Sequence, residues 1–368
     1  MEPTLKNISD SNGVLEFTLS DIDVSIANSL RRIIISDIPS YVFRTSPYEK
    51  NDAIIDINTT RFNNEILKQR LSCIPIHIKD PKFPYETYQI EIEKKNESSK
   101  IEYVTTEDFK IKNILNNEYL SREEQQKIFP ADSITKKYIE FARLRPLISD
   151  EIPGEALKLQ CKLSKCTASD DYMFNIVSVC SYGNTNDTSE AEKQWNIQEK
   201  KLKDYDDKDI QNMYNNFMIL DAKKYFIKNS FDFMIETVGI YTNYEIIKIG
   251  CQQLINKLNT IIQLIEDDNI KINKSDNTNN NSYDIVLENE DYTIGKPIEY
   301  ILHTKYYEDE KNKKIGYCGF IKKHPHDTYS IIRIIYLNDV NDTFVKNDIK
   351  ISCLNLIEIY NKIKSLFL

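Results

Sequence analysis

The sequence is poor in the residues and motifs that carry most enzyme and metal chemistry. Its 368 residues include 4 histidines, 8 glycines and 1 tryptophan, and no Cys-x-x-Cys pair occurs. Structural zinc sites usually contain such pairs, and P-loop, Gly-x-Ser-x-Gly and His-Glu-x-x-His motifs are also absent from the sequence. The sequence therefore predicts no cofactor and no catalytic residue.

The 7 cysteines are an odd number, with Cys161 and Cys166 spaced C-x4-C and Cys180 nearby. A metal site remains an alternative here, but no histidine lies close in sequence, so we expect reduced, half-buried thiols. The first residues, MEPTLKNISD, lack the apolar core of a signal peptide, and no apolar run approaches 18 residues. We expect a protein that is neither secreted nor membrane-spanning.

The chain has no excess of positive charge, with 48 Lys and Arg residues against 57 Asp and Glu residues. The formal net charge is −9 and the pI is near 5.2. A protein that binds nucleic acid through its own surface usually gathers basic residues to displace counterions from phosphates. Binding of DNA by this chain alone is therefore disfavoured, and we expect contact with DNA only through a larger complex.

Two amphipathic helices are present near the start of the chain, around residues 27–32 and 58–76. The first follows a strand at 14–19, begins at Asp23 or Ser25 and ends before Pro39. Its polar residues Asn28, Arg31 and Arg32 lie within one turn of each other. Such a patch is either an ordinary solvated helix face or a surface that holds another protein.

Two later helices carry matching apolar stripes with heptad-like spacing. The first follows Gly239 and ends near Ile265, and the second runs from about Asp342 to Leu368. We predict that the two stripes pair with each other, although each stripe packing on its own sheet is the alternative. The stripe residues are Ile247, Cys251, Leu254, Leu258, Ile261, Ile265, Ile349, Cys353, Leu356, Tyr360, Ile363 and Phe367.

Changes of composition divide the chain. A charge-rich stretch with two clear strands around Ser169 interrupts the first part, and a polar run predicts a flexible linker. The last part repeats the plan of the first on a smaller scale, with Asp291 and Gly295 shaping the turn into its helix. The predicted domains are 1–80 plus 225–265, an inserted mainly β domain at 81–224, the linker at 266–282, and a second module at 283–368.

Several of these motifs together resemble a known family. ANSLRRIIISDIPSYVF and NTTRFNNEILKQRLSCIPI resemble the α-type subunits of multisubunit RNA polymerases, namely the bacterial α N-terminal domain, the archaeal D-type subunit and the third subunit of RNA polymerase II. After the linker, LENEDYTIGKPIEYIL and YCGFIKKHPHDTYSIIRI resemble the archaeal L-type subunit or the eleventh subunit of polymerase II. Fusion of the two subunits in one chain is similar to what is found in the polymerases of large nucleocytoplasmic DNA viruses. The amino-acid usage, which is typical of an AT-rich genome, resembles that of a mimivirus-like virus.

The resemblance implies an α+β fold in which two dimerisation modules pair within one chain and the first carries the inserted domain. It implies a non-catalytic assembly platform that binds the largest and second-largest polymerase subunits and other small subunits. It implies no binding to a membrane. The location would be the virion and infected host cytoplasm for a virus, and otherwise the nucleus. The implied assembly residues are Asn28, Arg31, Arg32, Asn58, Thr59, Glu65 and Arg70.

Some features depart from the family or leave rivals open. SKCTASDDYMF replaces a glycine-rich and aromatic stretch, and Lys296-Pro297 stands where the small partner usually has an asparagine and an aliphatic residue. The acids at 204–207 and 267–268 also allow a metal-dependent nucleic-acid enzyme as a rival. An oligomerising structural protein unrelated to transcription is a third interpretation.

Overall fold

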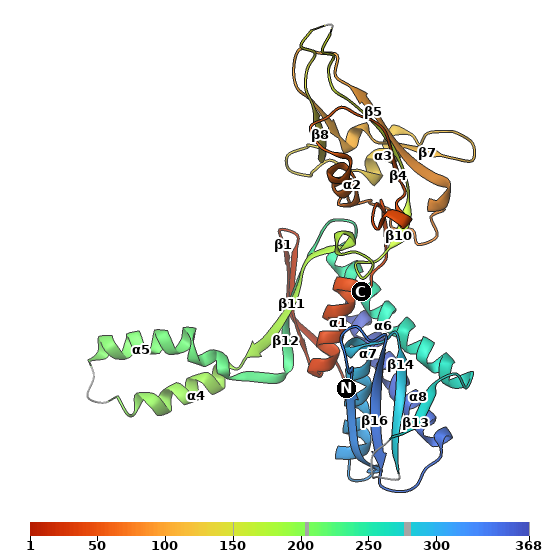
Figure 1. Ribbon diagram of the computed structural model, residues 1–368. Coiled ribbons are helices and arrows are strands. Elements are labelled where there is room, and N and C mark those ends of the chain that lie inside the picture. Colours follow the sequence, from red (N-terminus) through yellow and green to blue (C-terminus); the bar gives the residue numbers. More distant parts are fainter. Residues whose placement is uncertain (150, 203–205, 276–280, 368) are drawn as a thin grey trace. The chain divides into compact units, whose positions relative to one another are not determined.

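The computed structural model describes residues 1–149, 151–202, 206–275 and 281–367, which form two compact units (Figure 1). The pairing unit contains residues 1–34, 179–236 and 243–368, and the second unit contains 35–178 and 237–242. Within the described part, no helix is both long and apolar enough to cross a membrane.

The first module of the pairing unit is an antiparallel sheet with two helices. The strands lie in the order β1 (Thr4–Ser11), β2 (Val14–Ser20), β12 (Phe226–Thr237) and β11 (Val177–Asn186). Helix α1 (Val24–Ser36) follows β2, and helix α6 (Asn243–Glu266) follows β12. The sequence predicted either Asp23 or Ser25 at the start of α1. In the structure Asp23 has this position, because its Oδ1 accepts a hydrogen bond from the backbone N–H of Ser25 at 2.8 Å.

The second module has its own antiparallel sheet. Its strands lie in the order β13 (Lys271–Lys274), β14 (Ser282–Glu288), β16 (Tyr329–Tyr336) and β15 (Ile315–Ile321). Helix α7 (Tyr292–His303) continues into a π-helical turn at Thr304–Glu308, and helix α8 (Asp342–Leu366) closes the chain. Leu368, the last residue of the predicted closing helix, lies outside the described residues.

The two modules are copies of one plan down to the register of their strands. In the first, β2 pairs with β12 so that Ser20 faces Ser230 and Val14 faces Glu236. In the second, β14 pairs with β16 so that Glu288 faces Tyr329 and Ser282 faces Ile335. Ser20 therefore corresponds to Glu288, and Ser230 corresponds to Tyr329. The residue after each strand, Asp21 or Asn289, is left-handed with φ of 62° or 58°. The helices α1 and α7 then begin at equivalent positions.

Helices α6 and α8 pack against each other in antiparallel directions. Three polar contacts fix the direction: Lys364 donates to Gln252 at 2.8 Å, Lys350 to Glu266 at 2.7 Å, and Lys346 pairs with Asp268. All twelve predicted stripe residues are at most 8% exposed. The two helices are in contact, and the pairing of the stripes residue by residue stays a prediction.

Part of the predicted flexible linker at 266–282 forms a β-strand. Lys271–Lys274 form β13, which pairs with β14. The turn before it is hydrogen-bonded, because the backbone N–H groups of Asn269 and Ile270 both donate to the carbonyl of Leu264. Residues 276–280 lie outside the description. The second module thus begins near Lys271, and residues 267–270 connect it to α6.

The second unit is mainly β. Its larger sheet has the order β4 (Ala53–Asn58), β9 (Ala156–Lys162), β5 (Tyr88–Lys95) and β7 (Lys110–Asn113). Buried aromatic and aliphatic side chains from these strands and from α2 form its core. Its other elements are α2 (Asn64–Ser72), α3 (Arg122–Ile128), the pair β6 (Glu102–Thr105) and β8 (Glu140–Leu144), the pair β3 (Ser40–Val42) and β10 (Ser164–Cys166), and 3₁₀ turns at Tyr48–Lys50, Tyr85–Thr87, Thr106–Asp108 and Tyr172–Phe174.

The boundaries of these units differ from the predicted domain boundaries. Residues 35–80 belong with the second unit, because β4 pairs with β9 and Leu67 and Leu71 of α2 enter that unit's core. Residues 179–224 belong instead with the pairing unit, because β11 joins its sheet.

A helical arm connects β11 to β12. It consists of α4 (Thr188–Glu199), α5 (Asp207–Ile219) and a 3₁₀ turn at Asp221–Lys224. Trp195 and Phe217 are buried in a small core of the arm, with ring centroids 5.5 Å apart.

We expect Gly295→Ala to lower the free energy of unfolding by about 1–3 kcal/mol, the usual cost of overpacking. A Cβ at Gly295 would lie 1.9 Å from a ring carbon of Phe320, so either the Phe320 ring or α7 would have to shift. Denaturant unfolding measures the change. Gly183→Ala is the control, since its Cβ would meet nothing within 4 Å. Equal stabilities of the two variants would contradict the predicted close packing.

Candidate functional site

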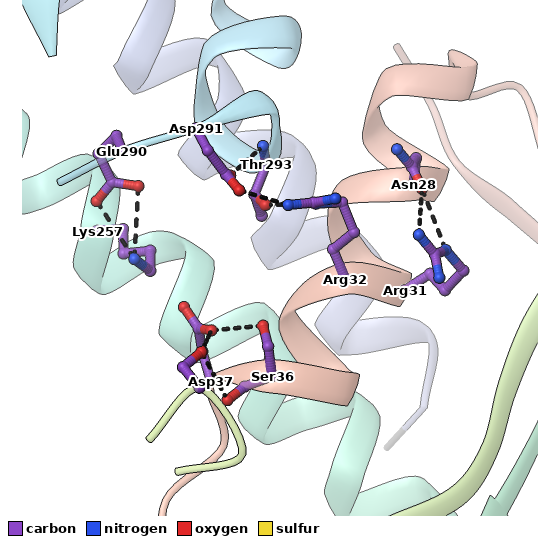
Figure 2. A network of polar contacts seen from close by, with 10 residues as sticks. Asn28, Arg31, Arg32, Ser36, Asp37, Lys257, Glu290, Asp291 and Thr293 are labelled. Carbon is purple, nitrogen blue, oxygen red and sulfur yellow. Dashed lines mark hydrogen bonds and ion pairs between the residues drawn. The ribbon is translucent and has the colours of Figure 1, made fainter. Parts of the chain in front are cut away.

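Arg32 of α1 binds the start of α7 in the second module (Figure 2). Its Nε donates to Thr293 Oγ1 at 2.8 Å, and its Nη2 forms an ion pair with Asp291. Asp291 is the N-cap of α7 and accepts the backbone N–H of Thr293 at 2.8 Å. One carboxylate therefore caps a helix and receives an arginine from the other module. Arg32, predicted to receive another subunit, is engaged within the chain.

Arg31 points to a different side of α1 from Arg32, as Figure 2 shows. Its Nε and Nη2 donate to Asn28 Oδ1 at 3.1 and 3.0 Å. No other hydrogen bond or ion pair of Arg31 is formed within the described residues, so its Nη1 donors remain available. Asn28 thus holds the guanidinium in one orientation, with the free edge suited to a carboxylate or carbonyl oxygens.

Two further contacts join the modules. Lys257 of α6 forms an ion pair with Glu290 at 3.3 Å, with side chains 29% and 15% exposed. The Ser29 hydroxyl of α1 lies 2.6 Å from the Tyr360 hydroxyl of α8. Burial raises the pKa of Tyr360, so this phenol stays neutral across the physiological range. These contacts were not predicted, because sequence patterns do not show which polar residues face each other across a helix pair.

The other four predicted assembly residues lie in the second unit. Arg70 uses its Nε and Nη2 on the carbonyls of Phe141 and Glu140, at 2.8 and 2.7 Å. Thr59 exchanges hydrogen bonds with the backbone of Ala156. These two side chains therefore bind within their own unit.

Asn58 and Glu65 differ in their exposure and contacts. The Asn58 amide donates to the Phe62 carbonyl at 2.8 Å. Glu65 is exposed in the first turn of α2 and has no ion pair within the described part of the chain. The seven predicted residues thus divide between the two units, three on α1 and four around α2.

The rival interpretations depend on acidic residues and cysteines, most of which lie in the part of the chain that the structure describes. Among the described residues, no cluster of three or more His, Cys, Asp or Glu side chains has metal-binding geometry. Asp268 pairs with Lys346, Asp206 precedes α5, and Asp204 lies outside the described residues. Six of the seven cysteines are buried and none is disulfide-bonded. Burial raises the thiol pKa of Cys251 to about 12.

Comparison with known proteins decides the family. Residues 16–258 match the family described as the RNA polymerase Rpb3/Rpb11 dimerisation domain. The chain belongs to this family. The matched range includes α1 and most of α6, the two helices of the first module that contact the second, and it confirms the expected α-type resemblance.

Curated relatives of this Rpb3/Rpb11-family chain are RNA polymerase subunits. It is 29% identical over 189 residues to DNA-directed RNA polymerases I and III subunit rpac1 of Dictyostelium discoideum, covering 48% of this chain and 50% of the relative. It is 35% identical over 74 residues to DNA-directed RNA polymerases IV and V subunit 3B of Arabidopsis thaliana, covering 20% and 21%. The human RPAC1 subunit of polymerases I and III is 39% identical over 71 residues, covering 19% and 18%.

The chain thus spans half the length of the Dictyostelium relative and about a fifth of the other two. These relatives are subunits of DNA-directed RNA polymerases, and the family match groups this chain with the Rpb3/Rpb11 dimerisation domain.

We expect Asp291→Asn to lower the free energy of unfolding by about 1–3 kcal/mol at pH 7, because a charged hydrogen-bond partner of Arg32 is lost while asparagine still caps α7. Burial opposes ionisation of Asp291, but hydrogen bonds from Thr293 and the charge of Arg32 outweigh it and lower the carboxyl pKa. A lowered folded-state pKa stabilises the fold above the unfolded value, about 3.9, and this stabilisation disappears as the pH falls below it.

The difference in the free energy of unfolding between wild type and Asp291→Asn should therefore be constant from pH 7 to about 4 and disappear at lower pH. Urea unfolding at a series of pH values measures it. Asp10→Asn, at an exposed position of β1, is the control. A difference in the free energy of unfolding that persists to pH 2 would show that the charge of Asp291 does not cause the lost stability.

Proposed function

We propose that the chain is a non-catalytic assembly platform of a multisubunit DNA-directed RNA polymerase. Its two modules pair internally, and the pair binds the two largest subunits and other small subunits, with DNA contacted only through the complex. The observation that carries the proposal is that the matched dimerisation domain packs, through α6, on a second copy of its own plan in the same chain. The first module would correspond to the archaeal D-type subunit and the second to the archaeal L-type subunit.

Arg31 is the leading residue for binding the second-largest subunit. Arg32 and Arg70 are already engaged within the chain, whereas Arg31 is oriented by Asn28 and keeps a free edge. Exposed Glu65 of the second unit would contribute a negative charge to the same subunit. Asn58 and Thr59 would shape the loop before α2.

The outer face of the second module's sheet would bind the largest subunit. Successive residues of β14 alternate, with Ile285 and Leu287 buried and Glu288 exposed. Tyr317 and Ile321 on the edge strand β15 are both 50% exposed. An exposed apolar pair beside charged residues is typical of a protein interface.

On this proposal the chain is located with its polymerase. That location is the nucleus or, for a viral polymerase, the virion and the cytoplasm of the infected host cell.

We expect Arg31→Glu to reduce capture of the second-largest subunit at least about tenfold, because it places a negative charge where a partner carboxylate or carbonyl would bind. Affinity capture of the tagged chain from its source, with mass spectrometry, measures the two largest subunits. The melting temperature should change little, since the hydrogen bonds of Arg31 within the described residues reach only Asn28.

Arg32→Glu is the matched comparison and should lower the melting temperature, because it faces Asp291. Unchanged capture with Arg31→Glu would remove Arg31 from the interface. Recovery of neither large subunit by the wild-type chain would overturn the assembly function.

Cleavage between Ser275 and Asn281 should leave the two fragments associated, because α6 and α8 remain packed and β13 stays paired with β14. A protease site inserted there and cut after folding allows the test by size-exclusion chromatography. Elution of two separate fragments would contradict internal pairing. The uncut insertion variant controls for damage by the insert.

A further inference from the structure

Strand β11 forms an open edge of the first module's sheet. The strand order β1, β2, β12, β11 places it at one end, so in the described part of the chain only β12 pairs with it. Ser181, Asn184 and Asn186 are exposed, and a Cβ added at Gly183 would meet nothing within 4 Å. Alternate N–H and C=O groups of an edge strand point away from its neighbour. Residues 179–186 therefore present a row of backbone groups that a further strand can bind.

β11 lacks the features that protect the opposite edge of its sheet. There, β1 contains Lys6 and Asp10, and its register shifts after Lys6, where Asn7 is left-handed with φ of 52°. Charged residues and bulges of this kind prevent unwanted strand pairing. The ten residues of β11, VSVCSYGNTN, include neither a charged residue nor a proline. An edge without this protection is expected where pairing with another strand is used.

Arg31 of α1 lies near one face of β11. Tyr182 points to the buried face of the sheet, because its ring centroid lies 5.5 and 5.4 Å from those of Phe231 and Phe233. Burial raises the pKa of Tyr182 and of Cys180, and the charge of Arg31 opposes the shift at both residues. Arg31 therefore acts electrostatically on the side of β11 where Tyr182 and Cys180 lie.

A strand added to β11 would bring a side chain close to Arg31. Such a strand lies about 4.8 Å beyond its neighbour, and its side chains alternate between the two faces of the sheet. One of them would stand beside Tyr182, on the face near Arg31. Because Asn28 already orients the guanidinium, a carboxylate at that position can accept hydrogen bonds from Nη1. An extended segment with an acidic residue thus matches both the backbone groups and the charge.

A second copy of this chain does not match both. Two copies paired through β11 would satisfy the backbone groups of each strand. However, β11 contains no acidic residue, so neither copy would bring a carboxylate from this strand to the Arg31 of the other. The charge of Arg31 favours a different, acidic segment.

We propose that an extended segment of the second-largest polymerase subunit pairs with β11 as a fifth strand of this four-stranded sheet and carries an aspartate or glutamate that binds Arg31. The inference rests on the proposed function, which names that subunit as the partner of Arg31. It adds the mode of binding, in which backbone hydrogen bonds hold the segment and Arg31 selects its charge.

Proline substitution tests the strand pairing in the full-length chain. Neighbouring residues of a strand direct their N–H groups to opposite sides, so one of Gly183→Pro and Asn184→Pro removes an outward donor and leaves the bonds to β12 intact. That variant is recognised by its unchanged melting temperature. It should reduce affinity capture of the second-largest subunit at least about tenfold, because a backbone hydrogen bond of the added strand is lost.

Gly183→Ala and Asn184→Ala are the matched controls, since both keep the backbone N–H, and they should capture the subunit as the wild type does. Capture by the stable proline variant equal to that of its alanine control would overturn strand pairing while leaving the assembly function intact.

Hydrogen exchange gives a measurement that needs no substitution. The amides of residues 179–186 that point outward should exchange at least about tenfold more slowly in the captured complex than in the free chain, because hydrogen-bonded amides exchange only when the structure opens. Mass spectrometry of the two samples measures this. Unchanged exchange of these amides would overturn the proposal, even if both proline variants prove unstable.

Photocrosslinking identifies the partner segment. A benzophenone amino acid placed at the exposed Ser181 should crosslink to a peptide of the second-largest subunit that contains an aspartate or glutamate. A peptide from a different subunit, or one without an acidic residue, would overturn the proposal. So would a dimer of the purified wild-type chain that the stable proline variant abolishes in light scattering. Recovery of neither large subunit by the wild-type chain would overturn the assembly function and this inference together, so the two failures are distinguishable.

Discussion

The antiparallel packing of α6 on α8 is the interaction on which the rest of the pairing unit depends. Fully burying an aliphatic side chain is worth about 1.5–3 kcal/mol, whereas an exposed ion pair contributes about 0–1 kcal/mol. Buried apolar residues of α6 and α8 therefore stabilise this packing more than the exposed ion pairs between the two helices do. The packing also brings α1 close to the first turn of α7, where Arg32 reaches Asp291. Apolar contacts hold the modules together, and polar contacts set their register.

Helices with a strong apolar periodicity could be predicted from the sequence, whereas strands with a weak pattern could not. The apolar stripes of α6 and α8 repeat at three and four residues, so the sequence indicated both helices and their buried faces. Strands β1 and β13 are polar and lie at sheet edges, where one face is solvated and no apolar alternation is required. The compact units differ from the predicted domains in part because β4 pairs with β9, a contact about 100 residues away in sequence.

The candidate site was predictable as a set of residue types but not as a set of roles. Arg31 and Arg32 are adjacent, yet consecutive residues on a helix point about 100° apart, so one faces α7 and the other does not. Which arginine is engaged depends on where α7 lies, and that depends on the packing of α8. Arg70 is similar, because its acceptors at Glu140 and Phe141 come from a strand distant in sequence. The family resemblance indicated the surface, and only the structure separates its internal contacts from its free donors.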